Sequence, residues 1–228
     1  MNNLDRKTTN IHTLLDQQIA NWREGHSGPI YCTSGCANCC TLEVQTTLAE
    51  GLLISRTHQP DLTRLEALCR SLGEQARAAV DFKSFLKNSR TTIGSCFFLE
   101  NANCTIYPHR PLPCRALLST RPAAWCGVDF STLHPLEREA FRSSLDRAVV
   151  AWPTHYVAAT QELARHQEEL LREQMQQTWG VALTGSLAVM VWLGSRFGEE
   201  PPDRDRIKKL LHELGCDHPF LVNFAETK

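Results

Sequence analysis

The sequence has 228 residues, 42% hydrophobic and 21% charged, which is typical of one globular domain or a small pair of domains and not of a disordered chain. Its 24 lysines and arginines nearly balance 25 aspartates and glutamates, so no overall field favours nucleic acid or an anionic membrane surface. The N-terminal segment around Asp5 has no apolar signal region behind it, and the longest apolar run, 183–193, is shorter than the ~20 residues that span a bilayer. We therefore expect a cytoplasmic protein without a nucleic-acid or membrane partner.

Apolar residues at helical spacing predict three helices in the first part of the chain. They run over residues 11–22, 42–58 and 62–80. The third has a single apolar stripe, and Asp61 precedes it as a suitable cap, because its carboxylate can accept hydrogen bonds from the free N–H groups of the first turn.

A proline-rich segment between residues 88 and 135 breaks this pattern. Its prolines forbid long helices, and no alternating run in it is long enough for a sheet. Something other than periodic packing must order this segment.

Helical spacing returns in the last part of the chain. Residues 141–149 share an apolar face, a polar helical run continues to Gln177, and residues 181–192 are apolar enough to be buried. The last predicted helix covers 207–214 and ends at Gly215, a residue suited to a helix C-terminus.

We therefore expect a mainly α fold in which helices surround an irregular cysteine-rich metal-binding segment, with little or no sheet. Residues 1–130 would form the cysteine-cluster domain with its N-terminal helices, and residues 131–228 a C-terminal helical region.

Ten cysteines are the unusual feature of this sequence. A reducing cytosol does not maintain structural disulfides, so metal ligation or thiol redox chemistry is the expected use. Cys36 and Cys39 have the two-residue gap that lets two thiolates turn onto one metal, and Cys32 can supply a third. The candidate metal ligands are the eight cysteines that gather in one part of the chain: Cys32, Cys36, Cys39, Cys40, Cys96, Cys104, Cys114 and Cys126.

The spacing of these cysteines favours an iron–sulfur cluster over zinc. Zinc ribbons use two short CxxC pairs per site, whereas this chain has one such pair and then gaps of 7, 9 and 11 residues. We expect an iron–sulfur cluster, of the [4Fe–4S] type, with zinc as the alternative. Cys39 and Cys40 are adjacent and should point in different directions, so one of them would serve a second centre or remain a free thiol.

Three further interpretations of the cysteines have less support. Disulfides, or buried thiols without metal, would not explain so dense a cluster in a cytosolic protein. The spacing of Cys32, Cys36 and Cys39 is also that of radical S-adenosylmethionine enzymes, but the alternating strands and helices of their barrel do not follow it.

The cysteines belong to a set of short motifs: Cys32-Thr-Ser-Gly-Cys36-Ala-Asn-Cys39-Cys40, Cys96-Phe-Phe-Leu, Cys104-Thr-Ile-Tyr107, Arg110-Pro111 and Cys114-Arg115. With these motifs, residues 31–126 resemble the YkgJ-like cysteine-cluster proteins, a family described as a zinc- or iron-chelating domain with a CxxCxxCC signature. This sequence departs from the pattern in having Ala37 where glycine is frequent and three residues between its first two cysteines. Flagellin lysine N-methylases look like relatives, so the resemblance also implies S-adenosylmethionine-dependent methyl transfer to a protein substrate as one alternative.

Basic residues near Cys114 are candidate cofactor contacts. Several thiolates around one metal centre leave a negative site, and Arg110 and Arg115 could offset that charge. His109 could bind metal or move protons, but a single histidine in a loop is more often exposed, so we leave it out of the predicted ligands.

The remaining two cysteines are expected to be structural. Cys69 lies on the apolar stripe of the third predicted helix. His212 and Cys216 are one helical turn apart, but Gly215 should end the helix between them and disperse a second metal site.

The sequence contains no GxSxG, GxxxxGK[ST], GxGxxG or HExxH motif, so chemistry is expected to pass through the cysteines. The leading hypothesis is a cysteine-cluster metalloprotein with a redox or protein-modifying role. The alternatives are a structural or storage zinc module and a protein lysine methyltransferase. Whether the chain is an enzyme does not follow from the sequence.

Overall fold

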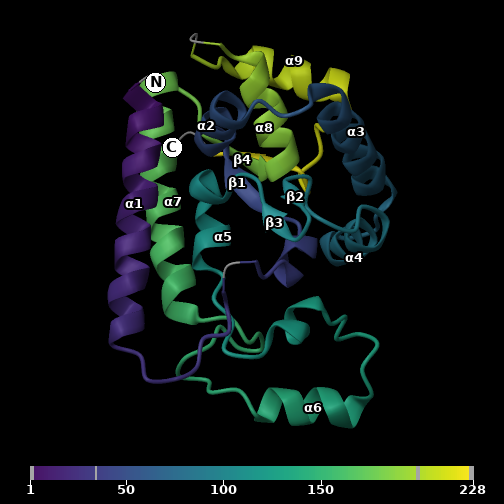
Figure 1. Ribbon diagram of the computed structural model, residues 1–228. Helices are drawn as coiled ribbons and strands as arrows, with labels where there is room; N and C mark the ends of the chain where they lie inside the picture. The colour runs from purple at the N-terminus through teal and green to yellow at the C-terminus, as the bar shows by residue number, and fades with distance from the viewer. Residues whose placement is uncertain (1–2, 34, 199–200, 226–228) are drawn as a thin grey trace.

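The computed structural model describes residues 3–33, 35–198 and 201–225. The fold is mainly α-helical with little sheet, as the sequence predicts (Figure 1). The helices are α1 (Asn3–Glu24), α2 (Leu48–His58), α3 (Leu62–Ala78), α4 (Phe82–Thr92), α5 (Leu112–Ala116), α6 (Pro135–Ser143), α7 (Ala158–Trp179), α8 (Leu187–Arg196) and α9 (Arg204–Leu214), with 3-10 helices η1 (Asn38–Thr41), η2 (Tyr107–His109) and η3 (Ala123–Gly127). The strands are β1 (Gln45–Thr47), β2 (Leu99–Glu100), β3 (Asn103–Cys104), β4 (Leu183–Ser186) and β5 (Val222–Phe224).

Two strand–helix units form the centre of the molecule. β1 leads into α2 and β4 leads into α8, and the two strands pair antiparallel, with β5 on the far side of β4. α2 and α8 pack closely because both have glycine at the crossing. A Cβ added at Gly51 would lie 2.3 Å from the Met190 carbonyl oxygen, and one at Gly194 would lie 2.8 Å from the backbone of Gly51.

Other helices enclose this centre on two sides. The long helices α1 and α7 lie side by side, and α5 packs against both (Figure 1). On the other side α3 packs against α8, α4 and α9 (Figure 1). The main hydrophobic core runs from Leu4 to Val222 in sequence, so residues on both sides of the expected boundary at 130 share one core.

A second, smaller apolar cluster lies around α6. Phe141, Leu145 and Val150 are buried there, and Trp125 and Phe130 pack against them. Figure 1 shows this segment extending from the main body below α5 and α7.

Several predicted helix boundaries are wrong for identifiable reasons. The helix expected from residue 42 begins at Leu48, because residues 45–47 pair with β4 and Thr47 caps α2. Helix α4 is absent from the sequence prediction; Asp81 caps it and Phe85 is fully buried. The apolar run 181–192 is buried as predicted, but its first residues form β4.

The last predicted helix is confirmed as α9, with Gly215 in the left-handed conformation at its end. None of the helices formed by the described residues has the length and hydrophobicity that a bilayer-spanning segment requires.

Candidate metal centre

Five of the eight predicted ligands lie on short elements, and Cys32, Cys36 and Cys96 lie in loops. Cys39 and Cys40 are in η1, Cys104 in β3, Cys114 in α5 and Cys126 in η3. Backbone contacts connect these elements, although they are far apart in sequence. The Cys96 N–H donates to the Cys40 carbonyl at 2.7 Å, and η3 packs against η1. The structure therefore gathers the segment that periodicity could not fold around η1.

One group of thiols consists of Cys40, Cys96, Cys104 and Cys114, and we call it the first set. Burial raises the pKa of Cys114, and the nearby thiols of Cys96 and Cys104 add to this effect. Burial also raises the pKa of Cys96 to about 11, with Cys104 contributing. Contact with Cys39 lowers the pKa of Cys40, while burial and the other three members oppose this. Thiols that influence one another in this way fit a shared cationic centre, which would stabilise their ionised forms.

Arg110 lies beside the first set. Burial raises the pKa of Cys104 and of Cys114, and the charge of Arg110 acts in the opposite direction at both. The guanidinium stacks over the Tyr107 ring at 4.1 Å from its centroid, which holds it near the thiols. This position fits the predicted role of Arg110 in offsetting the charge of several thiolates.

The Arg115 side chain forms hydrogen bonds with the helical scaffold. It is buried, and its guanidinium donates to Asp16 at 2.5 Å and to the carbonyls of Arg110 and Pro108. Its Nη2 lies 3.3 Å from His12 Nδ1. These contacts fix α5, the helix that carries Cys114, against α1.

Glu50 also anchors α5. Its carboxylate accepts from the Leu112 N–H at 2.8 Å and from the Thr46 hydroxyl at 2.7 Å, and it lies 3.0 Å from His12 Nε2. Burial raises the pKa of this carboxyl, but hydrogen bonding and charge from His12, with the bonds from Thr46 and Leu112, lower it to about 2. Glu50 is therefore an ionised hub joining α1, α2 and α5.

A second set of thiols consists of Cys32, Cys36 and Cys126. The Ser119 N–H donates to Cys32 Sγ at 3.1 Å, and the Tyr31 N–H donates to the Ser119 carbonyl at 2.9 Å. Burial raises the pKa of Cys32, and Cys126, Cys39 and Cys36 add to the shift.

His155 and Tyr156 lie at the second set and were missed by the sequence analysis. His155 Nε2 is 3.5 Å from Cys126 Sγ, and the His155 ring is 2% exposed. Its Nδ1 has no hydrogen-bond partner among the described residues. Burial raises the pKa of Tyr156, and Cys126 adds to the shift. No motif could have indicated these residues, because the isolated pairing of Ser119 with Tyr156 brings them to the cysteines.

Cys39 lies between the two sets. Interaction with the Cys40 thiol is the largest cause that raises the pKa of Cys39. The Cys39 charge also affects Cys32 on one side and Cys114 on the other. The adjacent thiols are thus closer together than the sequence analysis expects, and this pair joins the two sets.

The donor chemistry fits zinc or iron, because thiols are the ligands that both metals take in proteins. In the described part of the chain, however, no three cysteine, histidine or acidic side chains are arranged to hold one metal ion. The thiols share a region without the close spacing of a single-ion site.

The other cysteines and histidines of the sequence analysis lie elsewhere. Cys69 and Cys216 are buried in the main core, where the Cys216 thiol donates to the Cys69 carbonyl at 3.1 Å. His212 pairs with Asp217 at 2.9 Å on the surface. His109, in η2, has its pKa lowered by burial, with the charges of His12 and Arg115 adding to the effect.

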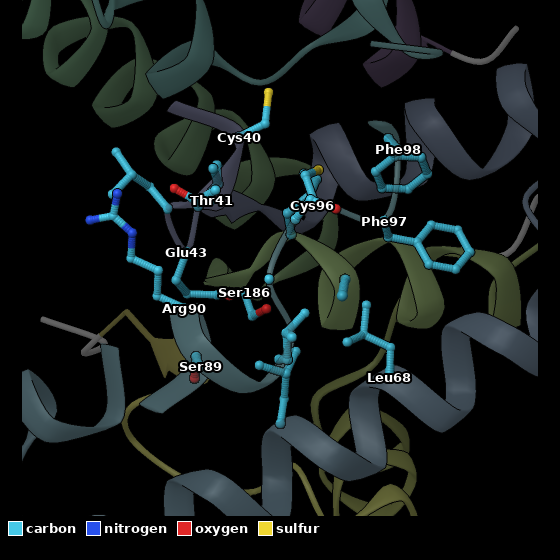
Figure 2. Close-up of a pocket in the computed structure, with 18 residues that line it drawn as sticks. Cys40, Thr41, Glu43, Leu68, Ser89, Arg90, Cys96, Phe97, Phe98 and Ser186 are labelled. Carbon is cyan, nitrogen blue, oxygen red and sulfur yellow. The ribbon is translucent and has the colours of Figure 1, made fainter. Parts of the chain in front are cut away.

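A pocket adjoins the first set (Figure 2). Cys40 and Cys96 form one side of it, and Glu43 and Ser186 lie close together below them in the figure. The remaining walls come mainly from α3, α4, α8 and the segment 93–98. The pocket is therefore a feature of the helical scaffold that reaches the predicted ligands.

The fold and the gathered thiols define a class of protein, a helical scaffold that carries a metal-chelating cysteine cluster. Residues 31–127 match the model of the family described as "CxxCxxCC: Putative zinc- or iron-chelating domain". The match includes all eight predicted ligands and confirms the resemblance. No curated protein and no solved structure matches the chain.

Proposed function

We propose that the protein binds an iron–sulfur cluster through its cysteine cluster, with zinc as the alternative metal. The observation that carries the proposal is the convergence of eight thiols from separate segments around η1.

The first set is the proposed cluster site. Cys40, Cys96, Cys104 and Cys114 supply four thiols, the number that a [4Fe–4S] cluster takes. Arg110 offsets part of the resulting negative charge. A cluster in this place would supply one-electron transfer, which a redox or protein-modifying role would use.

The second set is a proposed separate metal-binding position. Cys32, Cys36 and Cys126 supply thiols there, and His155 supplies an imidazole next to Cys126. Neutral imidazole is a common metal ligand, and burial, followed by the charge of Arg121, lowers the pKa of His155 to about 4.

The first experiment measures iron, zinc and acid-labile sulfide per chain, with the visible spectrum, in full-length protein purified without oxygen. Iron with sulfide is the expected result. Zinc without sulfide would establish the alternative metal, and protein with neither metal would contradict chelation.

Single variants then test the division into two sets. We expect Cys114→Ser to lose the metal of the first set and to retain that of the second set. Cys126→Ser or His155→Gln should lose the metal of the second set and retain that of the first set. Cys69→Ser is the matched control, because this thiol is buried in the core away from both sets, and it should retain all metal. Complete loss in both cysteine variants would show a single centre and overturn the division.

A further inference from the structure

The pocket beside the first set contains buried oxygen atoms without hydrogen-bond partners. Glu43 Oε1, Ser89 Oγ and Ser186 Oγ all have none among the described residues. Ser89 is 4% exposed and Ser186 1% exposed, and all three residues line the pocket (Figure 2). A buried polar atom without a partner is costly, so these atoms need a partner that the chain itself does not provide.

The pocket is lined by one carboxyl group, that of Glu43, and by one guanidinium group, that of Arg90. The Nη2 of Arg90 donates to the Cys126 carbonyl at 3.1 Å, and Figure 2 shows the guanidinium turned away from Glu43. Burial raises the pKa of the Glu43 carboxyl, and the Ser186 hydroxyl acts in the opposite direction. A cation at Glu43 would relieve the cost of burying its charge.

The other walls of the pocket are apolar. They come from Leu68, Leu72, Ile93, Phe97 and Leu187. A strongly hydrated metal ion does not suit such walls, and a single carboxylate is too few for calcium or magnesium.

We propose that this pocket binds a primary amine with an apolar stem. Its ammonium group would sit at Glu43, with Ser89 and Ser186 as further acceptors, and its stem would lie against the leucine and phenylalanine walls. An ammonium group has three donors, and the Glu43 carboxyl and the Ser89 and Ser186 hydroxyls each place an acceptor oxygen on the pocket wall. The ligand would lie next to Cys40 and Cys96. The proposal stands on the pocket alone and does not require the metal to be iron.

The test is titration calorimetry of the full-length, metal-containing protein with n-butylamine in an amine-free buffer at pH 7. 1-Butanol and pentanoate have the same butyl stem and serve as matched ligands. We expect the amine to bind more tightly than either. Equal binding of amine and alcohol, or no binding of the amine, would overturn the proposal, and the latter would mean that water occupies the pocket.

Variants test whether Glu43 causes the preference for the amine over the alcohol. Glu43→Gln should weaken amine binding about tenfold and leave the butanol affinity unchanged, because it removes the charge and keeps the shape. Ser186→Ala should weaken amine binding with Glu43 intact, and Glu100→Gln, on an exposed residue, should change nothing. Unchanged amine affinity in Glu43→Gln would also overturn the proposal. Metal content measured on the same samples separates this result from a failure of the metal proposal.

Discussion

Two glutamates within one short stretch of the chain are in opposite circumstances: Glu50 is buried, whereas Glu43 is half-buried with one buried carboxylate oxygen. Glu50 accepts hydrogen bonds from several groups, and its pKa falls to about 2. Glu43 has an unpaired oxygen, and burial raises its pKa. The same side chain is thus a structural anchor at one position and a candidate ligand contact at the other.

The carboxylate of Glu50 should make the free energy of unfolding depend on pH in the acid range. Its folded pKa is about 2, below its ordinary value of 4.5, so its stabilisation is present above pH 5 and is lost as pH falls toward 2. The shift corresponds to roughly 3 kcal/mol. We expect Glu50→Gln to lack this component in urea unfolding measured from pH 7 to pH 2. Glu100→Gln should retain it, and an acid dependence equal in all three proteins would contradict the assignment.

Glu43 should have the opposite pH dependence. Its raised folded pKa means that the native state holds a proton that the unfolded chain releases, so its contribution to stability is lost as pH rises above 4.5. Glu43→Gln should therefore be at least as stable as the natural protein at pH 8, by thermal unfolding. A large destabilisation of this variant at pH 8 would show that the carboxylate has a partner in the folded protein.

At the scale of elements, the crossing of α2 and α8 depends on two glycines. A Cβ at Gly51 would collide with the Met190 backbone at 2.3 Å, and backbone can't move aside as a flexible side chain can. We expect Gly51→Ala to cost about 1–3 kcal/mol in urea unfolding. Gly25→Ala is the control, because its nearest contacts would be 3.7 Å and 3.9 Å, and it should change stability by less than ~0.5 kcal/mol. A similar small effect at Gly51 would mean that the helices can separate freely.

Local capping explains two of the helix boundaries that the sequence predicts, although the Asp81 cap of α4 is missed. Asp61 accepts from the N–H groups of Thr63 and Arg64, and Gly215 ends α9, so these boundaries depend on local chemistry. The start of α2 depends on pairing between residues 45–47 and β4, more than a hundred residues away. No local pattern contains that information.

At the scale of the whole molecule, one hydrophobic core stabilises both the centre around α2 and α8 and the segment 96–126, which contributes Phe98, Ile106, Leu112, Ala116 and Leu118 to it. Apart from this, the segment consists of short elements, and among the described residues one backbone hydrogen bond, from the Cys96 N–H to the Cys40 carbonyl, joins it to η1. Metal binding would therefore contribute mainly to the order of this segment.

Removing the metal with a chelator should loosen this segment selectively. We expect amide hydrogen exchange to become faster in residues 96–126 and to stay unchanged in α8. The metal-containing Cys69→Ser variant is measured in parallel, and it controls for the loss of one thiol without loss of metal. Equal acceleration in α8 would show that metal supports the entire fold.

The sequence by itself determined the helical class, the helix capped by Asp61, the end of the last helix at Gly215 and the eight candidate ligands, because helical period, capping residues and thiol spacing are local properties. The family match over residues 31–127 agrees with that reading of the cysteines. Only the tertiary structure divided the thiols into two sets, placed Arg110 beside one and His155 beside the other, and turned Arg115 into the scaffold. It also left the oxygens of Glu43 and Ser186 unpaired in one pocket. These relations join residues that are far apart in the chain, and packing alone brings them together.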